Sequence, residues 1–390
     1  MAKRPMEGIV VADFTTMVAG ASATRLLVDC GAEVIKIESP EGGDLMRQAL
    51  PHQENVSILY AQYNAGKRSI TLDLKGAAGR QIALDLIARS DIVVENFRPG
   101  VMKRLGLDYE TVSREQPSLI YCSISGFGQT GPLSQRAAYA PVAHAFSGFD
   151  LMLSRLAEPG APPPDNRIMI ADSVGGIYGF SAIQTALVRR LLHGEGSYID
   201  VSMAEGMVSL VATPMQLIQR DATYVANHFP AYRTLDGYVN LPLVSINTYR
   251  LAYKVIGREQ WLDDPGFNSL PGVKERSVEI KAAIADWTAT RTSKECDEIM
   301  TRAGVPSSIY YLPHELFDHP HMLERGAFTT IDAHGQPFTV LNPPFKISGT
   351  SVDARPFVSG LGADTREVLR QMLGLTDAAL DDLAAKKAFG

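Results

Sequence analysis

One acidic residue, Asp172, has the type and the surroundings that covalent chemistry needs. It follows the apolar run Ile168–Ala171 and precedes the pair Gly175–Gly176, where the spacing predicts the start of a helix. A carboxylate at a helix start can act as a nucleophile, with backbone N–H groups stabilising a developing oxyanion. Helix capping is the alternative, because Asp is a favoured N-cap residue that contributes about 1 kcal/mol. Each glycine lowers the stability of a helix by about 1 kcal/mol relative to Ala, and a capping role does not explain why two of them stand here. A close approach of another chain or ligand to the backbone would explain them better.

Other motifs indicate different chemistry only weakly. Gly126–Gly131 matches G-x-G-x-x-G after a predicted strand, but Pro132 follows it, and a dinucleotide fingerprint belongs in the first strand-to-helix turn. Gly66–Ser69 resembles the end of a P-loop, but Arg68 occupies the position of the Ser or Thr that holds magnesium. The histidines of His314–His321 are not spaced to put two metal ligands on one helix face. We therefore expect neither a bound nucleotide cofactor nor a metal.

Composition excludes several classes of protein. The 390 residues carry 37 Lys and Arg against 43 Asp and Glu, a net charge of −6, without the long basic run that nucleic-acid binding needs. With 45% apolar and 21% charged residues, and no apolar stretch of about 18 residues, the chain is expected to be a globular cytoplasmic protein without a membrane span. Cys30, Cys122 and Cys296 are widely spaced among apolar neighbours and are expected to be reduced core residues.

The elements that must position Asp172 alternate between strands and helices. Strands are predicted at 8–14, 33–37, 91–94, 118–124 and 197–201, and helices at 19–27, 77–89, 107–115, 175–192 and 205–220. This alternation predicts an α/β fold with a parallel sheet and helices on both faces. From about residue 226 to about residue 331, short strands, polar helices and many turn residues indicate a second, smaller domain. A short strand at 338–341 and a helix pair at 364–385 follow.

Several motifs together form the pattern of a known family. They are Gly8–Phe14, Gly31–Glu38, Gly43–Asp44 with Arg47, Lys67–Lys75, Glu95–Gly100 leading to Arg104–Gly106, Ser123–Gly128, Ala171–Asp172, Gly194–Gly196 and Asn342–Phe345. On these motifs the chain resembles the family III coenzyme A transferases of the CaiB/BaiF type over nearly its whole length. The resemblance implies a Rossmann-like large domain over 1–225 that 332–390 completes, a smaller α+β domain over 226–331, and an interlocked homodimer.

The resemblance also implies an activity, the transfer of CoA from an acyl-CoA thioester to a small carboxylic acid, dicarboxylic acids included. Asp172 falls on the family's catalytic aspartate, which would form an aspartyl-acyl anhydride and then an aspartyl-CoA thioester. CoA thioesters would be substrates, and no permanently bound cofactor is expected.

The family's binding positions fall on specific residues of this chain. Those expected to contact CoA are Val18, Leu72, Lys75, Asn96, Phe97, Arg98, Arg104, Ala138 and Tyr139. The three cations suit the phosphates of CoA, and the phenylalanine suits its adenine. Those expected to face the acceptor acid are Met17, Ala140, Tyr232 and Arg233, with the arginine as a bidentate partner of a distal carboxylate.

The segment Arg136–Ala140 leaves the activity open at one point. Transferases of the family commonly carry an acidic residue after its tyrosine, where this chain has Ala140. The related α-methylacyl-CoA racemases place a His-Asp pair there to move a proton, and Tyr139 with Ala140 cannot do this work, so a transferase is favoured over a racemase or epimerase. His144, about one helical turn further on, would weaken this argument if it reached the site. A non-catalytic CoA-binding dimer is the third alternative.

Overall fold

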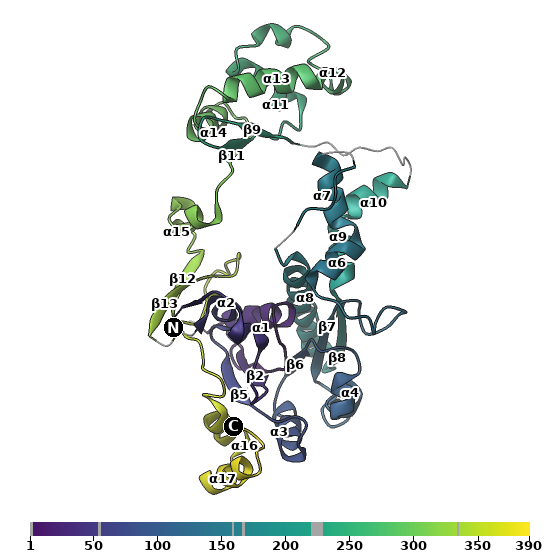
Figure 1. Cartoon of the computed structure of the whole chain (residues 1–390), viewed down its shortest axis with the longest axis vertical. Helices are drawn as coiled ribbons and strands as arrows, with labels where there is room; N and C mark the ends of the chain where they lie inside the picture. The colour runs from purple at the N-terminus through teal and green to yellow at the C-terminus, as the bar shows by residue number, and fades with distance from the viewer. Residues whose placement is uncertain (1–2, 54–55, 158–159, 166–167, 220–228, 334) are drawn as a thin grey trace. The chain divides into compact units, whose positions relative to one another are not determined.

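The computed structural model describes residues 3–53, 56–157, 160–165, 168–219, 229–333 and 335–390. The chain divides into two compact units, Met1–Tyr224 with His321–Gly390, and Val225–Pro320 (Figure 1). The first division, expected at 225–226, lies outside the described residues. The chain returns to the larger unit at His321, earlier than the expected residue 332, because the hairpin of β12 (Phe328–Ala333) and β13 (Gln336–Leu341) packs into a core of that unit.

A six-stranded parallel sheet organises the larger unit. Its order is β5-β2-β1-β6-β7-β8, and the strands are β1 (Val10–Asp13), β2 (Glu33–Glu38), β5 (Arg68–Thr71), β6 (Ile92–Glu95), β7 (Ile120–Ser125) and β8 (Ser197–Ser202). The strand numbers rise in both directions from the neighbouring strands β1 and β6, so the strand order reverses between these two. Doubly wound folds have the same reversal, and their ligands bind there, outside the carboxyl ends of the strands. The α/β class and the parallel sheet are confirmed.

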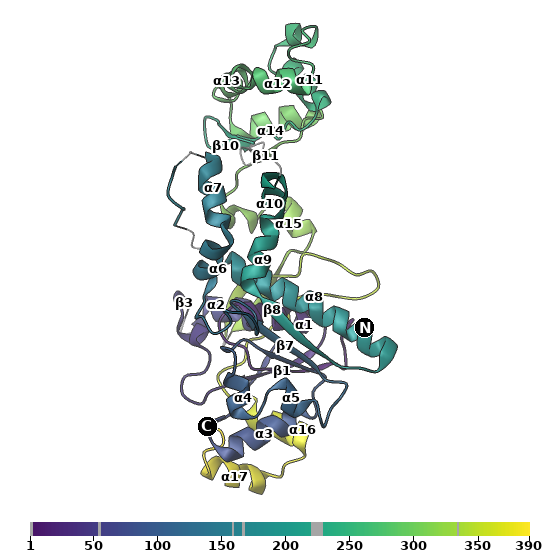
Figure 2. The ribbon, with the colours of Figure 1, turned by 90° about the vertical axis from the view of Figure 1, so that its right-hand side faces the viewer.

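Both faces of the sheet are buried, because successive strand residues point to opposite sides. In β6, Ile92 and Val94 join the core of α1 (Ala19–Asp29) and α8 (Ile170–His193). Val93 joins the core of α3 (Ala77–Ile87) and α16 (Thr365–Leu373). Figure 2 shows these two helix layers on opposite sides of the strands.

Shorter elements complete the two units. The larger unit also holds η1 (Leu45–Gln48), β3 (His52–Gln53), β4 (Val56–Ser57), α2 (Ile58–Asn64), α4 (Val101–Leu105), α5 (Tyr109–Val112), α6 (Ala140–Ser147), α7 (Phe149–Ala157), α9 (Met203–Leu210), α10 (Ala212–Ile218) and α17 (Asp377–Ala385). The smaller unit holds the antiparallel strands β9 (Ala231–Arg233), β10 (Tyr238–Asn240) and β11 (Ser308–Ile309) with α11 (Ile246–Val255), η2 (Glu259–Leu262), α12 (Leu270–Glu275), α13 (Ser277–Thr288), α14 (Ser293–Arg302) and η3 (Pro313–Leu316). Helix α15 (Pro320–Glu324) spans the second division.

Three helices differ from the sequence expectation. The helix expected over 205–220 is broken at Val211 into α9 and α10, because Pro214 has no N–H to donate to the carbonyl of Leu210. The helix expected over 107–115 is reduced to α5, and α8 begins at Ile170, before the glycine pair. In the described part of the chain, no helix has the length and apolar character to cross a bilayer.

Candidate active site

The β1–α1 turn lies where the strand order reverses, and residues after two neighbouring strands hold it. Met17 adopts a left-handed backbone conformation with a φ of 61°. The Oδ1 of Asp44, after β2, accepts hydrogen bonds from the Met17 N–H and the Thr16 hydroxyl, both at 3.0 Å. The amide of Asn96, after β6, accepts from the Thr16 N–H and donates to the Thr16 carbonyl, both at 2.8 Å. Asn96, a predicted CoA contact, therefore shapes the turn.

Two lysine–aspartate pairs lie buried next to this turn. The Nζ of Lys36 lies 2.9 Å from Oδ2 of Asp44 and donates to the Thr15 carbonyl at 2.8 Å, and the Nζ of Lys67 lies 3.1 Å from Oδ2 of Asp13. Burial by itself would raise the pKa of Asp13 and of Asp44, but the lysine charges and hydrogen bonds outweigh it and lower both pKa values. Both carboxylates are therefore ionised, and their charges are compensated in place.

Asp172 is a partly buried carboxylate in different surroundings. It is the third residue of α8, whose N-cap position is held by Met169, so the capping alternative is wrong. Burial raises the pKa of Asp172 to about 6, although hydrogen bonds from the backbone N–H groups of Ala19 and of Asp172 itself oppose the rise. Ala19 is the first residue of α1. The carboxylate thus lies at the N-termini of two helices, whose dipoles favour a negative charge.

Gly176, in the second turn of α8, lets that helix pack closely against α1. A Cβ on Gly176 would lie 1.9 Å from Oγ of Ser22 and 2.9 Å from the carbonyl oxygen of Ala19. Gly175 faces Met203 of α9, whereas the close approach at Gly176 is made by α1. This contact brings the first turn of α1, with its Ala19 N–H, to the carboxylate.

Two further side chains lie close to Asp172. His144 of α6 is buried, and its Nε2 accepts a hydrogen bond from the Ala171 N–H at 3.1 Å, while its Nδ1 lies 3.6 Å from Oδ2 of Asp150. The other is Tyr63 of α2. Burial raises the pKa of its phenol, and so does the charge of Asp172, which lies near enough to act on it. A tyrosine in a short helix carries no sequence pattern that marks it, so Tyr63 is not among the sequence candidates.

A cavity of about 600 Å³ opens beside the same turn. Thr15 and Thr16 of the turn line it together with Leu72, Lys75 and Phe97. The last three are predicted CoA contacts, and an apolar side chain, an exposed cation and an aromatic ring suit an adenine nucleotide. The β1–α1 turn therefore lines this cavity with its threonines and leads directly into the first residue of α1, whose N–H reaches Asp172.

The other predicted CoA contacts do not line this cavity. Val18 is buried at the N-cap of α1, Arg98 and Arg104 are exposed around α4, and Ala138 and Tyr139 directly precede α6. Ala138 packs against Gly126, where a Cβ would come within 2.3 Å of the alanine Cβ. This packing accounts for the first glycine of the G-x-G-x-x-G match.

The predicted acceptor positions are divided between the units. Met17 lies in the β1–α1 turn, and Ala140 is buried at the start of α6. Tyr232 lies in the core of the smaller unit and is only 6% exposed, and its contact with the acceptor stays a prediction. Arg233, the next residue of β9, is exposed because strand residues alternate between faces.

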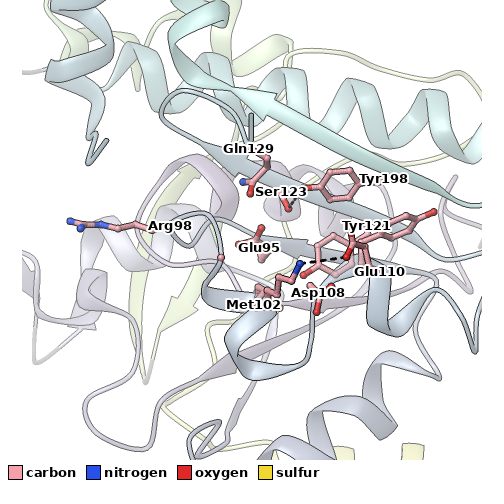
Figure 3. Close-up of a pocket in the computed structure, with 12 residues that line it drawn as sticks. Glu95, Arg98, Met102, Asp108, Glu110, Tyr121, Ser123, Gln129 and Tyr198 are labelled. Carbon is pink, nitrogen blue, oxygen red and sulfur yellow. Dashed lines mark hydrogen bonds and ion pairs between the residues drawn. The ribbon is translucent and has the colours of Figure 1, made fainter. Parts of the chain in front are cut away.

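A second cavity, of about 490 Å³, lies on the face of the sheet opposite α8 (Figure 3). Glu95, Tyr121, Ser123 and Tyr198 line it from β6, β7 and β8, and burial raises the pKa of Glu95 to about 7. Arg98 also lines it, but its guanidinium points away from the tyrosine rings in Figure 3. This cavity is separate from the Asp172 site. Within the described residues, no group of three or more His, Cys, Asp and Glu is placed to hold a metal ion.

Comparisons with known proteins agree with the sequence motifs. The model of CoA-transferase family III matches residues 6–365. The chain is 31% identical to the succinate–glutarate CoA-transferase of Agrobacterium fabrum, over 95% of this chain and 96% of that protein, and 30% identical to the succinyl-CoA–D-citramalate CoA-transferase of Chloroflexus aurantiacus, over 98% of each. A solved structure of a CaiB/BaiF family protein from Brucella suis superposes with a TM-score of 0.82 at 27% identity, over 95% of this chain and 100% of that one. The chain therefore belongs to CoA-transferase family III.

Proposed function

We propose that this enzyme transfers CoA from a donor acyl-CoA to a small dicarboxylic acid through covalent intermediates on Asp172. The observation that carries the proposal is the β1–α1 turn, which lines the larger cavity with Thr15 and Thr16 and leads into α1, whose first residue, Ala19, donates its N–H to Asp172. With the adenine nucleotide of CoA in that cavity, the pantetheine arm follows the turn and brings the thioester to the carboxylate.

The side chains of the cavity support binding of the nucleotide end of CoA. Leu72 and Phe97 offer apolar contact to the adenine, and Lys75 offers a charge-assisted hydrogen bond to a phosphate. Arg98 and Arg104 are exposed on the adjoining segment and supply further positive charge for the diphosphate. Asn96 acts indirectly, because its amide holds the turn.

In the first half-reaction, a carboxylate oxygen of Asp172 attacks the carbonyl carbon of the donor thioester. A C–O bond forms, the C–S bond breaks, and the electron pair leaves on CoA thiolate, which gives an aspartyl-acyl anhydride. The thiolate then attacks the carbonyl carbon of Asp172, and the donor acid leaves as a carboxylate, which gives an aspartyl-CoA thioester. The N–H groups of Ala19 and Asp172 point to this carboxyl group and suit the oxyanion that develops on it.

In the second half-reaction, the acceptor carboxylate attacks the aspartyl-CoA carbonyl carbon and releases the thiolate. The thiolate attacks the acceptor carbonyl of the new anhydride, which yields acceptor-CoA and free Asp172. Each step exchanges one acyl bond for another, so the electrons balance without an oxidant, a reductant or ATP. Burial supports the attack, because a carboxylate whose pKa is raised to about 6 is less stabilised as an anion.

The acceptor class follows from the relatives. Those from Agrobacterium fabrum and Chloroflexus aurantiacus are named for succinate, glutarate and D-citramalate, which are dicarboxylic acids. We assign the distal carboxylate of the acceptor to Arg233, which is exposed on β9. This assignment requires that Arg233→Ala raises KM for a dicarboxylic acceptor and leaves KM for the acyl-CoA donor unchanged.

We further propose that two chains form an interlocked homodimer. Exposed apolar side chains on α8, including Leu191 at 85% and Leu192 at 69%, offer surface for a second copy to cover. Sedimentation at micromolar concentration should find a species of twice the 42.3 kDa chain mass. A compact, folded species of one chain would contradict this proposal.

The test of the function is a transfer assay with succinyl-CoA and a panel of glutarate, D-citramalate, itaconate, mesaconate and benzoate. We expect CoA thioesters of dicarboxylic acids to form, and borohydride or hydroxylamine added with the donor to inactivate the enzyme and label Asp172. Failure of every acid in the panel, or labelling of another residue, would falsify the proposal.

The racemase alternative requires a different reaction and a different readout. A racemase exchanges the α-proton of an acyl-CoA, so in deuterated water it incorporates deuterium at the α-carbon without an acceptor acid. We expect no such exchange, because the described surroundings of Asp172 put the Nε2 lone pair of His144 on a backbone N–H. A non-catalytic CoA-binding dimer would show neither transfer nor exchange.

A further inference from the structure

We propose that His144 is a positioning residue, which holds the first turn of α8 in the conformation that places the Asp172 carboxylate for attack. The inference rests on the proposed function of Asp172 as the nucleophile. It concerns a side chain that does not touch the substrate but fixes the residue that does.

The backbone donors at the start of α8 show what His144 contributes. The first N–H groups of a helix have no acceptor one turn earlier inside it. Here the Ile170 N–H donates to the Ile168 carbonyl at 2.8 Å, and the Ser173 N–H donates to the Met169 carbonyl at 3.0 Å. The Asp172 N–H donates to its own carboxylate. The Ala171 N–H donates to Nε2 of His144, so this first turn is completed by a side chain of α6.

Burial makes this hydrogen bond important for the position of the turn. Ala171 is 0% exposed and His144 is 2% exposed, so water does not replace the histidine as an acceptor. A buried N–H without a partner is unfavourable enough that the backbone shifts to find one. The turn that would shift carries Asp172 as its next residue, and with it the contact to the Ala19 N–H.

The geometry also sets the tautomer of His144. Nε2 accepts a hydrogen bond, so its lone pair is free of a proton and the ring proton lies on Nδ1. That nitrogen faces Oδ2 of Asp150, in the first turn of α7, at 3.6 Å. A carboxylate beside Nδ1 favours this tautomer. The helices α6 and α7 thus supply a two-residue support for the start of α8.

The support acts on the rate and not on the affinity for CoA. The cavity that suits the adenine nucleotide is lined by the β1–α1 turn, the end of β2, segments after β2, β5 and β6, and Lys387. The described polar contacts of His144 reach none of them. A misplacement of a reacting group by about 1 Å can cost about 100-fold in rate. Loss of the acceptor should therefore lower kcat while KM for the acyl-CoA stays nearly constant.

The test compares His144→Gln with His144→Met. The two side chains have nearly the same length, but the amide oxygen of Gln accepts a backbone N–H and the thioether of Met accepts one only weakly. We expect the Gln variant to keep kcat within about threefold of wild type, and the Met variant to lose about 10- to 100-fold in kcat with KM for succinyl-CoA within about twofold. The rate of borohydride trapping at Asp172 should fall in parallel with kcat.

The controls separate this inference from the proposed function. Asp172→Asn that retains turnover would overturn the function, whatever the His144 variants do. An inactive Asp172→Asn together with equal kcat values for the folded Gln and Met variants would overturn the positioning role alone. If the Met variant does not fold, the Gln variant decides, and a folded Gln variant with less than a tenth of wild-type kcat would contradict the inference.

Discussion

The β1–α1 turn has carboxylates on two sides, buried on one side and partly buried on the other, and they differ in their partners. Asp13 and Asp44 face Lys67 and Lys36, and their pKa values are lowered. Asp172 receives two backbone N–H groups, no described cation contributes to its pKa, and that pKa is raised to about 6. Burial acts in the same direction on all three carboxylates, so the cations decide the difference. The paired carboxylates hold the turn, and the carboxylate without a cation remains reactive beside it.

The largest expected effect is the loss of turnover in Asp172→Asn. An amide cannot form the anhydride, so kcat should fall at least ~10³-fold, while binding of CoA measured by calorimetry persists. Ionised Asp172 destabilises the folded state, because its pKa rises from 3.8 to about 6 on folding. Removal of the charge should therefore raise the free energy of unfolding at pH 7 by roughly 1–3 kcal/mol. Normal transferase activity in this variant would contradict the assignment of Asp172 as the reactive carboxylate.

The second prediction breaks the paired side. Lys36→Met leaves Asp44 without the cation at 2.9 Å, and removal of one partner of a buried ion pair costs about 3–5 kcal/mol of stability. Denaturant unfolding at pH 7 measures this loss. The matched control is Lys386→Met, which removes an exposed pair with Asp382 and should cost at most about 1 kcal/mol. Equal losses in the free energy of unfolding of the two variants would show that the buried pair contributes no more to stability than the exposed pair.

The third prediction tests which cavity binds the nucleotide. Lys75→Ala should raise KM for the acyl-CoA by about 5- to 50-fold with little change in kcat, because a phosphate contact far from the thioester is made equally in the ground and transition states. Lys103→Ala is the control, since Lys103 lines the second cavity instead. Steady-state kinetics with varied donor measures both. A larger effect of Lys103→Ala on KM would indicate that the nucleotide binds in the second cavity, on the other face of the sheet.

The smallest effect is the dependence on pH. Because only ionised Asp172 attacks, kcat/KM for the donor, which reports the free enzyme, should be halved near pH 6, where the pKa of Asp172 lies, and should fall about tenfold per pH unit below it. Stability follows the opposite direction. The folded state binds this proton more tightly than the unfolded chain, so the contribution of Asp172 to stability falls as pH rises from about 4 to about 6 and is constant above. A pH-independent kcat/KM between pH 5 and pH 8 would exclude Asp172 as the titrating nucleophile.

Local patterns in the sequence are sufficient for much of the fold. The alternation of apolar strands and helices predicts the parallel sheet, since the period of apolar residues reports which side of each element is buried. The same patterns do not report features that packing between distant segments decides, such as where a helix begins or which strand residue is buried. The helix expected from Gly175 begins at Ile170, and in its first turn the Ala171 N–H donates to His144 of another helix. Tyr232 is a buried core residue, because the cover of β9 is supplied by residues far along the chain.

The sequence by itself determined that Asp172 is the main catalytic candidate, that the chain carries the family motifs, and that each competing motif lacks either a residue or the context that its chemistry needs. Only the tertiary structure decided what surrounds the carboxylate. Ala19, Tyr63 and His144 come from three different helices, and the packing of Gly176 against α1 brings one of them to the site. The physical reason is that residue type sets the ordinary pKa of a carboxyl group, whereas burial and the distance to charges and N–H groups set its actual pKa. Those distances join segments that lie far apart in the chain.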